Sequence, residues 1–358
     1  MRRPARVRRH RHLGELPDRL EGPQGGAVRR RHGDRREADL GLAQVGARVI
    51  KAVVADPPHF DSKAGARPLL KVFSVVRYRF FLYAGLLPYL LGAAWAYGVE
   101  RTFRPGIFWT GFFGIFLSVV GVESFNEYFD SRMGTDRVFN PEDEDPIPDW
   151  VLWAGIAAFA AAASVGLYLA VAGGWPIVLY TLLGGMAAVF YVGPPIRWVY
   201  RGLGETMIGL SYGPWMTLGS LHLQTGRFSW GALLASCVPG FLIMALAVVN
   251  AIPDFHQDRL VGKRNIVVRV GRLNGVKVYL FLAALGLLAP VLGVALGVFP
   301  PATLVTLLAA PLLFLSGREA FVTYDTPRDF IGAVRFIVVG YIAGTSLFTL
   351  ALLVSRWT

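Results

Sequence analysis

Nine runs of about 20 mostly apolar residues dominate this sequence and restrict its fold more than any other feature. Such a run crosses a hydrocarbon core about 30 Å thick as an α-helix, which satisfies its own backbone hydrogen bonds. The chain has 358 residues, of which 54% are hydrophobic and 17% charged, more apolar surface than a soluble domain of this size can bury. The sequence therefore predicts an all-α polytopic membrane protein, a bundle of about nine transmembrane helices near residues 78–98, 107–127, 150–172, 175–193, 205–223, 230–252, 275–296, 299–316 and 332–354.

The basic residues predict how this bundle is oriented. If the amino terminus is cytoplasmic, the loops near 130–149, 194–204, 254–274 and 317–331 are cytoplasmic too. From residue 71 onward, that side then receives sixteen Lys and Arg residues and the other side four. Because cytoplasmic loops carry an excess of Lys and Arg, we expect a multi-pass protein of the cell (cytoplasmic) membrane with this orientation.

The formal charge of +12 resembles that of a nucleic-acid-binding protein, but its distribution argues against such a partner. Many arginines lie in the first 50 residues, and most others lie in the expected cytoplasmic loops. We interpret residues 1–70 as a basic N-terminal extension, disordered at least over 1–48, and residues 71–358 as the membrane domain. The alternative is that translation starts further along the chain and residues 1–48 are not translated.

Two polar clusters follow the second and the sixth predicted span on the cytoplasmic side. The first cluster contains Asn126, Asp130 and Asp136. Asn126 and Asp130 are four residues apart and share a helix face, and Gly134 permits a turn that brings Asp136 back toward them. The second cluster repeats an amide and two carboxylates at spacings of four in Asn250, Asp254 and Asp258.

Carboxylates stacked one helical turn apart repel by about 4 kcal/mol per close pair at an effective dielectric constant near 20. A bound cation offsets this repulsion, and Mg²⁺ prefers oxygen ligands and bridges carboxylates to substrate phosphates. Two such clusters would hold two ions around one diphosphate and stabilise it as a leaving group. For either cluster alone, a solvated helix cap or a partner for a neighbouring arginine explains the acids equally well.

Cations and tyrosines near the two clusters are candidates for contacts with the diphosphate. Arg132 and Arg137 adjoin the first cluster, and Lys263 and Arg264 follow the second. The positive-inside rule alone also explains basic residues in these loops. Tyr191 and Tyr200 border a stretch broken by prolines and glycines, where they would bond phosphate or acceptor, or belong to an interfacial tyrosine belt.

These motifs resemble those of the UbiA superfamily of intramembrane prenyltransferases, over residues from about 72 to 354. The family pattern Asn-Asp-x-x-Asp with a later Asp is matched by Asn126, Glu127, Asp130 and Asp136. The second pattern, Asp-x-x-x-Asp followed by Gly-Lys, is matched by Asp254, Asp258, Gly262 and Lys263.

Within the family, the sequence is most similar to dihydroxynaphthoate polyprenyltransferases of menaquinone synthesis, on the Gly134-Thr135-Asp136 spacing and the runs 200–205, 262–264 and 268–272. Glu127 replaces the usual Asp, Pro253 stands where relatives commonly have Arg, and Asn265 where they have Thr. The acidic run 142–145 also departs from the family. These departures bear on the identity of the acceptor.

The resemblance implies a helical bundle whose cavity opens sideways to lipid. It also implies Mg²⁺-dependent transfer of a prenyl group from an isoprenoid diphosphate to an aromatic or quinone-precursor acceptor, with release of diphosphate. The expected metal ligands are Asn126, Asp130, Asp136, Asp254 and Asp258, with Asp130, Asp254 and Asp258 essential for catalysis. The expected diphosphate contacts are Arg132, Arg137, Lys263, Arg264, Tyr191 and Tyr200.

Other functions remain open on the sequence. A UbiA-type enzyme with another acceptor (hydroxybenzoate, a tetrapyrrole or a lipid) would carry the same metal motifs. A CDP-alcohol phosphotransferase would carry a denser Asp-Gly and Ala-Arg pattern than this chain has. A transporter would place polar sites in mid-membrane and often contain an internal repeat, whereas the acids here gather at helix ends on one side.

Overall fold

The computed structural model describes residues 85–133 and 147–355, and every regular element within them is helical. The predicted extension 1–70, the start of the first predicted span, Asp136 and Arg137 lie outside the described residues. The helices are α4 (Leu86–Gly98), α5 (Pro105–Met133), α6 (Asp149–Gly173), α7 (Trp175–Val189), α8 (Gly204–Leu210), α9 (Met216–Thr225), α10 (Trp230–Ala251), α11 (Phe255–Leu260), α12 (Ile266–Val270), α13 (Arg272–Ala295), α14 (Ala310–Thr323) and α15 (Ile331–Val354), with short helical turns η2 (Trp198–Arg201), η3 (Ser211–Trp215) and η4 (Pro301–Ala309).

The described helices confirm the all-α membrane fold predicted from the sequence. Six helical segments are long and apolar enough to cross a membrane: Pro105–Arg132, Asp149–Gly173, Trp230–Ala251, Arg272–Ala295, Pro301–Thr323 and Ile331–Val354. α7 is apolar but shorter, and α8, η3 and α9 follow one another without a break over residues 204–225. The predicted number of nine spans is therefore not established by length and composition alone.

Helix α10 forms the centre of the packing. In its most apolar window 67% of the residues are buried, against 28% in α5 and in α6. It packs against α13, α15, α8 and η3. Leu242, Ile243, Leu246 and Val249 are at most 2% exposed. Lipid tails are as apolar as the side chains that face them, so the hydrophobic effect does not drive the helices together inside the membrane. The order of the helices is therefore fixed by this internal packing.

Glycines allow the closest helix contacts. A Cβ atom added to Gly213, in the π-helical turn η3, would lie 2.7 Å from the Cα atom of Gly240 on α10. Likewise, a Cβ atom at Gly92 on α4 would clash with the Thr217 carbonyl oxygen on α9. The Ser220 hydroxyl donates to the Tyr89 carbonyl oxygen at 2.7 Å across the same α4–α9 contact. Small residues thus let backbones approach where lipid provides no hydrophobic drive for association.

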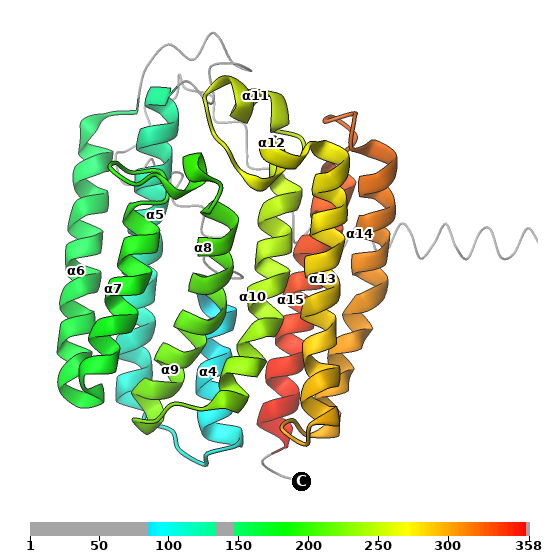
Figure 1. The fold of residues 1–358 in the computed structure, drawn as a ribbon. Coiled ribbons are helices and arrows are strands. Elements are labelled where there is room, and N and C mark those ends of the chain that lie inside the picture. The colour runs from blue at the N-terminus through cyan, green and yellow to red at the C-terminus, as the bar shows by residue number, and fades with distance from the viewer. Residues whose placement is uncertain (1–84, 134–146, 356–358) are drawn as a thin grey trace, which may run out of the picture. The chain divides into compact units, whose positions relative to one another are not determined.

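The connecting loops divide the bundle into two ends. α11, α12 and the loop between α7 and α8 lie at one end, and the carboxyl end of α15 lies at the other (Figure 1). α10 stops at Ala251 because Pro253 has no N–H group to continue the helix, and α11 starts after this break. Of the second polar cluster, Asn250 therefore stays on the last turn of α10, whereas Asp254 and Asp258 lie beyond the break, at the start of α11 and on it.

We expect Gly92→Ala to destabilise the protein by about 1–3 kcal/mol, because the added methyl group forces α4 away from α9. Gly184→Ala on α7 is the matched control, since no atom lies within 4 Å of the methyl group that it would add. Thermal unfolding of both variants in the same detergent measures the difference. Equal unfolding temperatures would show that the α4–α9 approach is not constrained by Gly92.

Candidate functional site

The first polar cluster lies on the last turns of α5, which continues to Met133 and so carries the motif on a regular helix. Asn126 and Asp130 are both partly buried, and their spacing of four places them on one helix face. Glu123, seven residues before Asp130 and 5% exposed, shares this face. The end of α5 thus presents a column of oxygen-bearing side chains.

The second polar cluster spans the break between α10 and α11, because Asn250 lies in the last turn of α10 and Asp258 lies on α11. Asp254 immediately precedes the helix and is exposed, whereas Asp258 is only 6% exposed. The Asp258 amide donates to the Asp254 carbonyl oxygen at 2.8 Å, so the two carboxylates are one helical turn apart. Asp258 is the buried member of the pair, and Asp254 is accessible to solvent.

Lys263 joins the two clusters. Its Nζ atom lies 3.4 Å from Asp130 Oδ1 on α5 and 3.6 Å from Asp258 Oδ1 on α11. The Lys263 amide also donates to the Asp258 carbonyl oxygen at 2.8 Å, which holds the loop after α11 in a tight turn. Carboxylates that are 128 positions apart in the sequence therefore face one cation, and the two predicted clusters form a single site.

The electrostatics of this trio follow from its burial. Burial raises the pKa of the Asp258 carboxyl, and the nearby Lys263 ammonium and the Asn265 hydrogen bond oppose the increase. Burial by itself would lower the pKa of Lys263, but Asp130 and Asp258 together raise it above its usual value. Lys263 therefore stays protonated near neutral pH and supplies the positive charge that both carboxylates need.

Both predicted tyrosines lie near these charges. Burial raises the pKa of Tyr191, and the negative charges of Glu205, Asp130 and Asp258 add to this effect. Burial also raises the pKa of Tyr200, and the Lys263 ammonium opposes it. Both phenols therefore remain protonated and can donate hydrogen bonds to an anion bound beside Lys263.

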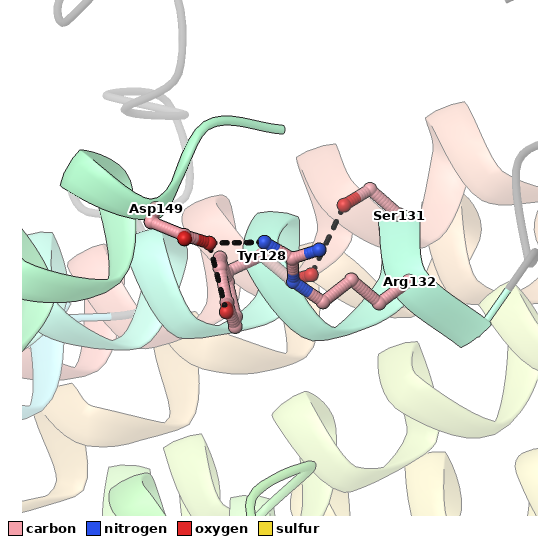
Figure 2. A network of polar contacts seen from close by, with 4 residues as sticks. All are labelled: Tyr128, Ser131, Arg132 and Asp149. Carbon is pink, nitrogen blue, oxygen red and sulfur yellow. Dashed lines mark hydrogen bonds and ion pairs between the residues drawn. The ribbon is translucent and has the colours of Figure 1, made fainter. Parts of the chain in front are cut away.

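Arg132 is directed toward the start of α6. Figure 2 shows the Arg132 guanidinium and the Tyr128 hydroxyl both reaching the Asp149 carboxylate, the Tyr128 bond being 3.2 Å long. The Arg132 Cζ atom also lies 4.2 Å from the centroid of the Tyr128 ring. Asp149 is in the first turn of α6, where a negative charge is favourable. This exposed network joins α5 to α6, and the contact of Arg132 with a diphosphate stays a prediction.

Arg264, another predicted diphosphate contact, lies in the loop after α11. Arg264 is exposed, and its amide donates to the Val199 carbonyl oxygen at 3.4 Å, which ties the loop after α11 to the loop before α8. Arg137, like Asp136, lies outside the described residues. Neither the Arg264 contact with diphosphate nor that of Arg137 is tested by this geometry.

Three residues near the site were not predicted from the sequence to be site residues. Glu205 and Asn265 are 3% and 4% exposed. Asn265 donates a hydrogen bond to Asp258, and Glu205 accepts one from the Ile266 amide. Arg197 has a left-handed backbone, with φ of 54°, and its guanidinium carbon lies 5.8 Å from the centroid of the Tyr200 ring. The only sequence signal for Asn265 was that relatives commonly have Thr at this position. No spacing rule indicated a role in the site for Glu205 or Arg197.

The donor set fits a divalent ion that is held partly by its substrate. Among residues 85–133 and 147–355, no three His, Cys, Asp or Glu side chains are placed to hold a metal ion by themselves. Mg²⁺ is usually bound by one or two carboxylates, waters and substrate phosphates, and not by a complete protein cage. Asp130 and Asp258, which both lie within 3.6 Å of one ammonium nitrogen, provide such a partial site.

We expect Lys263→Met to destabilise the protein by about 1–3 kcal/mol, because two carboxylates then repel each other in a mostly buried site. Adding Asp130→Asn should recover part of this loss, since one of the repelling charges is removed. Thermal unfolding of the single and double variants measures the coupling. Lys277→Met, at an exposed lysine of α13, is the control. A double variant less stable than Lys263→Met would contradict the charge assignment.

Solved structures with related folds support this arrangement of helices. A structure titled for digeranylgeranylglyceryl phosphate synthase in membranes superposes with a TM-score of 0.56 at 15% identity, covering 79% of this chain and 98% of that chain. The apo structure of a UbiA homologue from Aeropyrum pernix superposes with a TM-score of 0.53 at 20% identity, covering 72% of this chain and 96% of that chain. At these identities the likeness establishes the fold alone.

Sequence comparisons identify relatives of known name. A 1,4-dihydroxy-2-naphthoate octaprenyltransferase from Bacillus subtilis is 24% identical over 60% of this chain and 71% of its own length. The enzyme of that name from Mycobacterium tuberculosis is 27% identical over 60% of this chain and 75% of its own length. A 2-carboxy-1,4-naphthoquinone phytyltransferase from Synechocystis is 25% identical over 71% of this chain and 83% of its own length. The profile of the UbiA prenyltransferase family matches residues 85–339, and the chain is a prenyltransferase that belongs to this family.

Proposed function

We propose that this protein transfers a prenyl group from a polyprenyl diphosphate to a hydroxynaphthoate-type aromatic acceptor, with Mg²⁺ as cofactor and diphosphate as leaving group. The observation that carries the proposal is the Lys263 ammonium between Asp130 and Asp258, because it brings both acidic motifs to one cation site. The acceptor class is taken from the names of the relatives, which act on naphthoate or naphthoquinone compounds. Dihydroxynaphthoate is the first acceptor to test.

The residues of the site have distinct proposed roles. Asn126, Asp130 and Asp136 from the first motif, and Asp254 and Asp258 from the second, would hold Mg²⁺ together with diphosphate oxygens. When bound, the metal supplies positive charge that stabilises the departing diphosphate. Lys263, Tyr191 and Tyr200 would contact the diphosphate oxygens directly. The exposed Arg264, with Arg132 and Arg137, would add positive charge at the rim.

The reaction needs charge stabilisation more than proton transfer. The bond between the allylic C1 atom and the diphosphate oxygen breaks, and both electrons leave with the oxygen. A carbon of the electron-rich aromatic ring then forms the new C–C bond to C1. The same carbon loses its proton, or its carboxylate as carbon dioxide, and the electron pair of the broken bond returns to the ring. Lys263 and the two protonated tyrosines would stabilise the negative charge that builds up on the oxygen during bond breaking.

The position of the site suits substrates that partition between membrane and water. The diphosphate head would lie at the end of the bundle that carries α11 and α12, while the isoprenoid tail would extend along the apolar helices toward lipid. The sixteen-to-four distribution of basic residues supports a location of this end on the cytoplasmic side of the cell membrane. We also propose that the prenyltransferase domain comprises residues 71–358 and that residues 1–70 form a separate extension.

Asp130→Ala and Asp258→Ala should each lower prenyl transfer by about 100-fold or more, because each removes a carboxylate that would hold the Mg²⁺ whose positive charge stabilises the leaving diphosphate. The assay uses membranes with labelled polyprenyl diphosphate, Mg²⁺ and dihydroxynaphthoate, with products identified by mass. Asp325→Ala is the control, since Asp325 pairs with Arg272 outside the site. Full activity of either site variant would overturn the proposed ligands. A product formed only with hydroxybenzoate or another acceptor would overturn the naphthoate assignment.

Removing divalent ions with a chelator should abolish product formation, and added Mg²⁺ should restore it. The reason is that Asp130 and Asp258 supply a partial site that a metal completes only with substrate phosphates. Product mass and free diphosphate are measured in the same reaction. Undiminished turnover in the presence of excess chelator would refute the metal requirement.

A further inference from the structure

Asp258 has both carboxylate oxygens engaged, each by a different residue. Oδ1 lies 3.6 Å from the Lys263 ammonium, and Oδ2 accepts a hydrogen bond of 2.6 Å from Asn265 Nδ2. Asp258 and Asn265 are 6% and 4% exposed, so water competes little for this bond. The Asn265 bond therefore fixes which oxygen of Asp258 faces Lys263 and, beyond it, Asp130.

The Asn265 amide is itself held in one orientation. Its Oδ1 atom accepts a hydrogen bond of 2.8 Å from the Val268 amide and so caps the amino terminus of α12. If the amide were flipped, its NH₂ group would face the Val268 N–H group and its oxygen would face the Asp258 carboxylate, and both contacts would be repulsive. The cap thus points the Nδ2 donor at Asp258.

Glu205 anchors the same stretch of backbone from a different helix. Its Oε1 atom accepts a hydrogen bond of 2.9 Å from the amide of Ile266, the residue after Asn265. Glu205 lies in the first turn of α8 and is 3% exposed, and its Oε2 atom has no hydrogen-bond partner among the described residues. A buried carboxylate is costly to keep, so a contribution to the site offers a reason for its presence.

We propose that Asn265, anchored through its neighbour Ile266 by Glu205, is a positioning residue that fixes the Asp258 carboxylate for cation and diphosphate binding. The proposal rests on the proposed function insofar as Asp258 is taken to bind the metal. Partners that orient a ligating carboxylate typically change metal affinity by about 10- to 100-fold when they are removed. An asparagine can do this where a serine or threonine cannot, because its side-chain oxygen caps the helix while its NH₂ group, one bond further from the backbone than a hydroxyl, is a separate donor.

The test uses Asn265→Ser in the purified full-length protein. Serine preserves the helix cap but is too short to donate to Asp258, so the thermal stability should stay close to that of the wild type. Mn²⁺ serves as the probe, and its binding is followed by electron paramagnetic resonance with and without inorganic diphosphate. We expect a Kd for Mn²⁺ about 10-fold weaker than in the wild type. Asn274→Ser, at an exposed asparagine of α13, is the matched control and should bind as the wild type does.

Variants of Glu205 test the anchor separately. Glu205→Gln retains an oxygen that can accept from Ile266, so its Mn²⁺ affinity should stay near that of the wild type. Glu205→Ala removes the acceptor and should weaken Mn²⁺ binding in the same direction as Asn265→Ser. Equal affinities of the Gln and Ala variants would refute the role of Glu205 as an anchor.

Asp258→Asn separates the inference from the proposed function on which it rests. If Asp258→Asn binds Mn²⁺ as tightly as the wild type, Asp258 is not a metal ligand. The positioning role of Asn265 and the metal role of Asp258 in the proposed function are then both wrong. If Asp258→Asn weakens binding but Asn265→Ser does not, the positioning role alone is refuted. Should the serine variant unfold, Asn265→Thr provides a second capping side chain without the donor, and wild-type Mn²⁺ affinity in that variant would refute the role as well.

Discussion

The contact of one lysine ammonium with carboxylates from two distant helices is the interaction on which the site depends. Like charges about 4 Å apart repel by about 4 kcal/mol at an effective dielectric constant near 20. The Lys263 ammonium beside both Asp130 and Asp258 opposes such a repulsion with attraction on both sides. The lysine is held in place because its own amide bonds to the Asp258 carbonyl oxygen. The two acidic motifs therefore form one site even before a substrate arrives.

Close helix packing brings the motifs to the same end. In a membrane, helices associate through fitted surfaces and short backbone approaches rather than through the hydrophobic effect. The contact between Gly213 and Gly240 lets the π-helical turn η3 pack closely on α10. Helix α8, which carries Glu205, runs directly into this turn. The position of α8 in turn supports the stretch around Asn265 through the Ile266 amide. The polar site thus depends on apolar contacts that lie elsewhere in the bundle.

Local features of the sequence predicted the helices and the motifs, but not the contacts between them. Long apolar runs identify membrane helices because a span must be both long and apolar, and the spacing of Asn126 and Asp130 sets a shared face on any regular helix. The position of Lys263 between Asp130 and Asp258 depends on the path of the loop after α11, which no spacing rule gives. The roles of Glu205 and Asn265 could not be predicted for the same reason, since their partners lie 61 and 7 positions away.

The distribution of buried acids argues for an enzyme built at one end of the bundle rather than for an ion path through it. Glu123, Asp130 and Asn126 occupy the last three turns of α5, and the other buried acids, Glu205 and Asp258, are drawn to the same end. The core of α10 is aliphatic by contrast, with Leu242, Ile243 and Leu246 fully buried. A transported ion would need polar partners along the whole path, since each unpaired charge in the apolar interior costs several kcal/mol. A lipid diphosphate needs charged partners only at its head group, and the buried acids of the described residues lie at that end of the bundle.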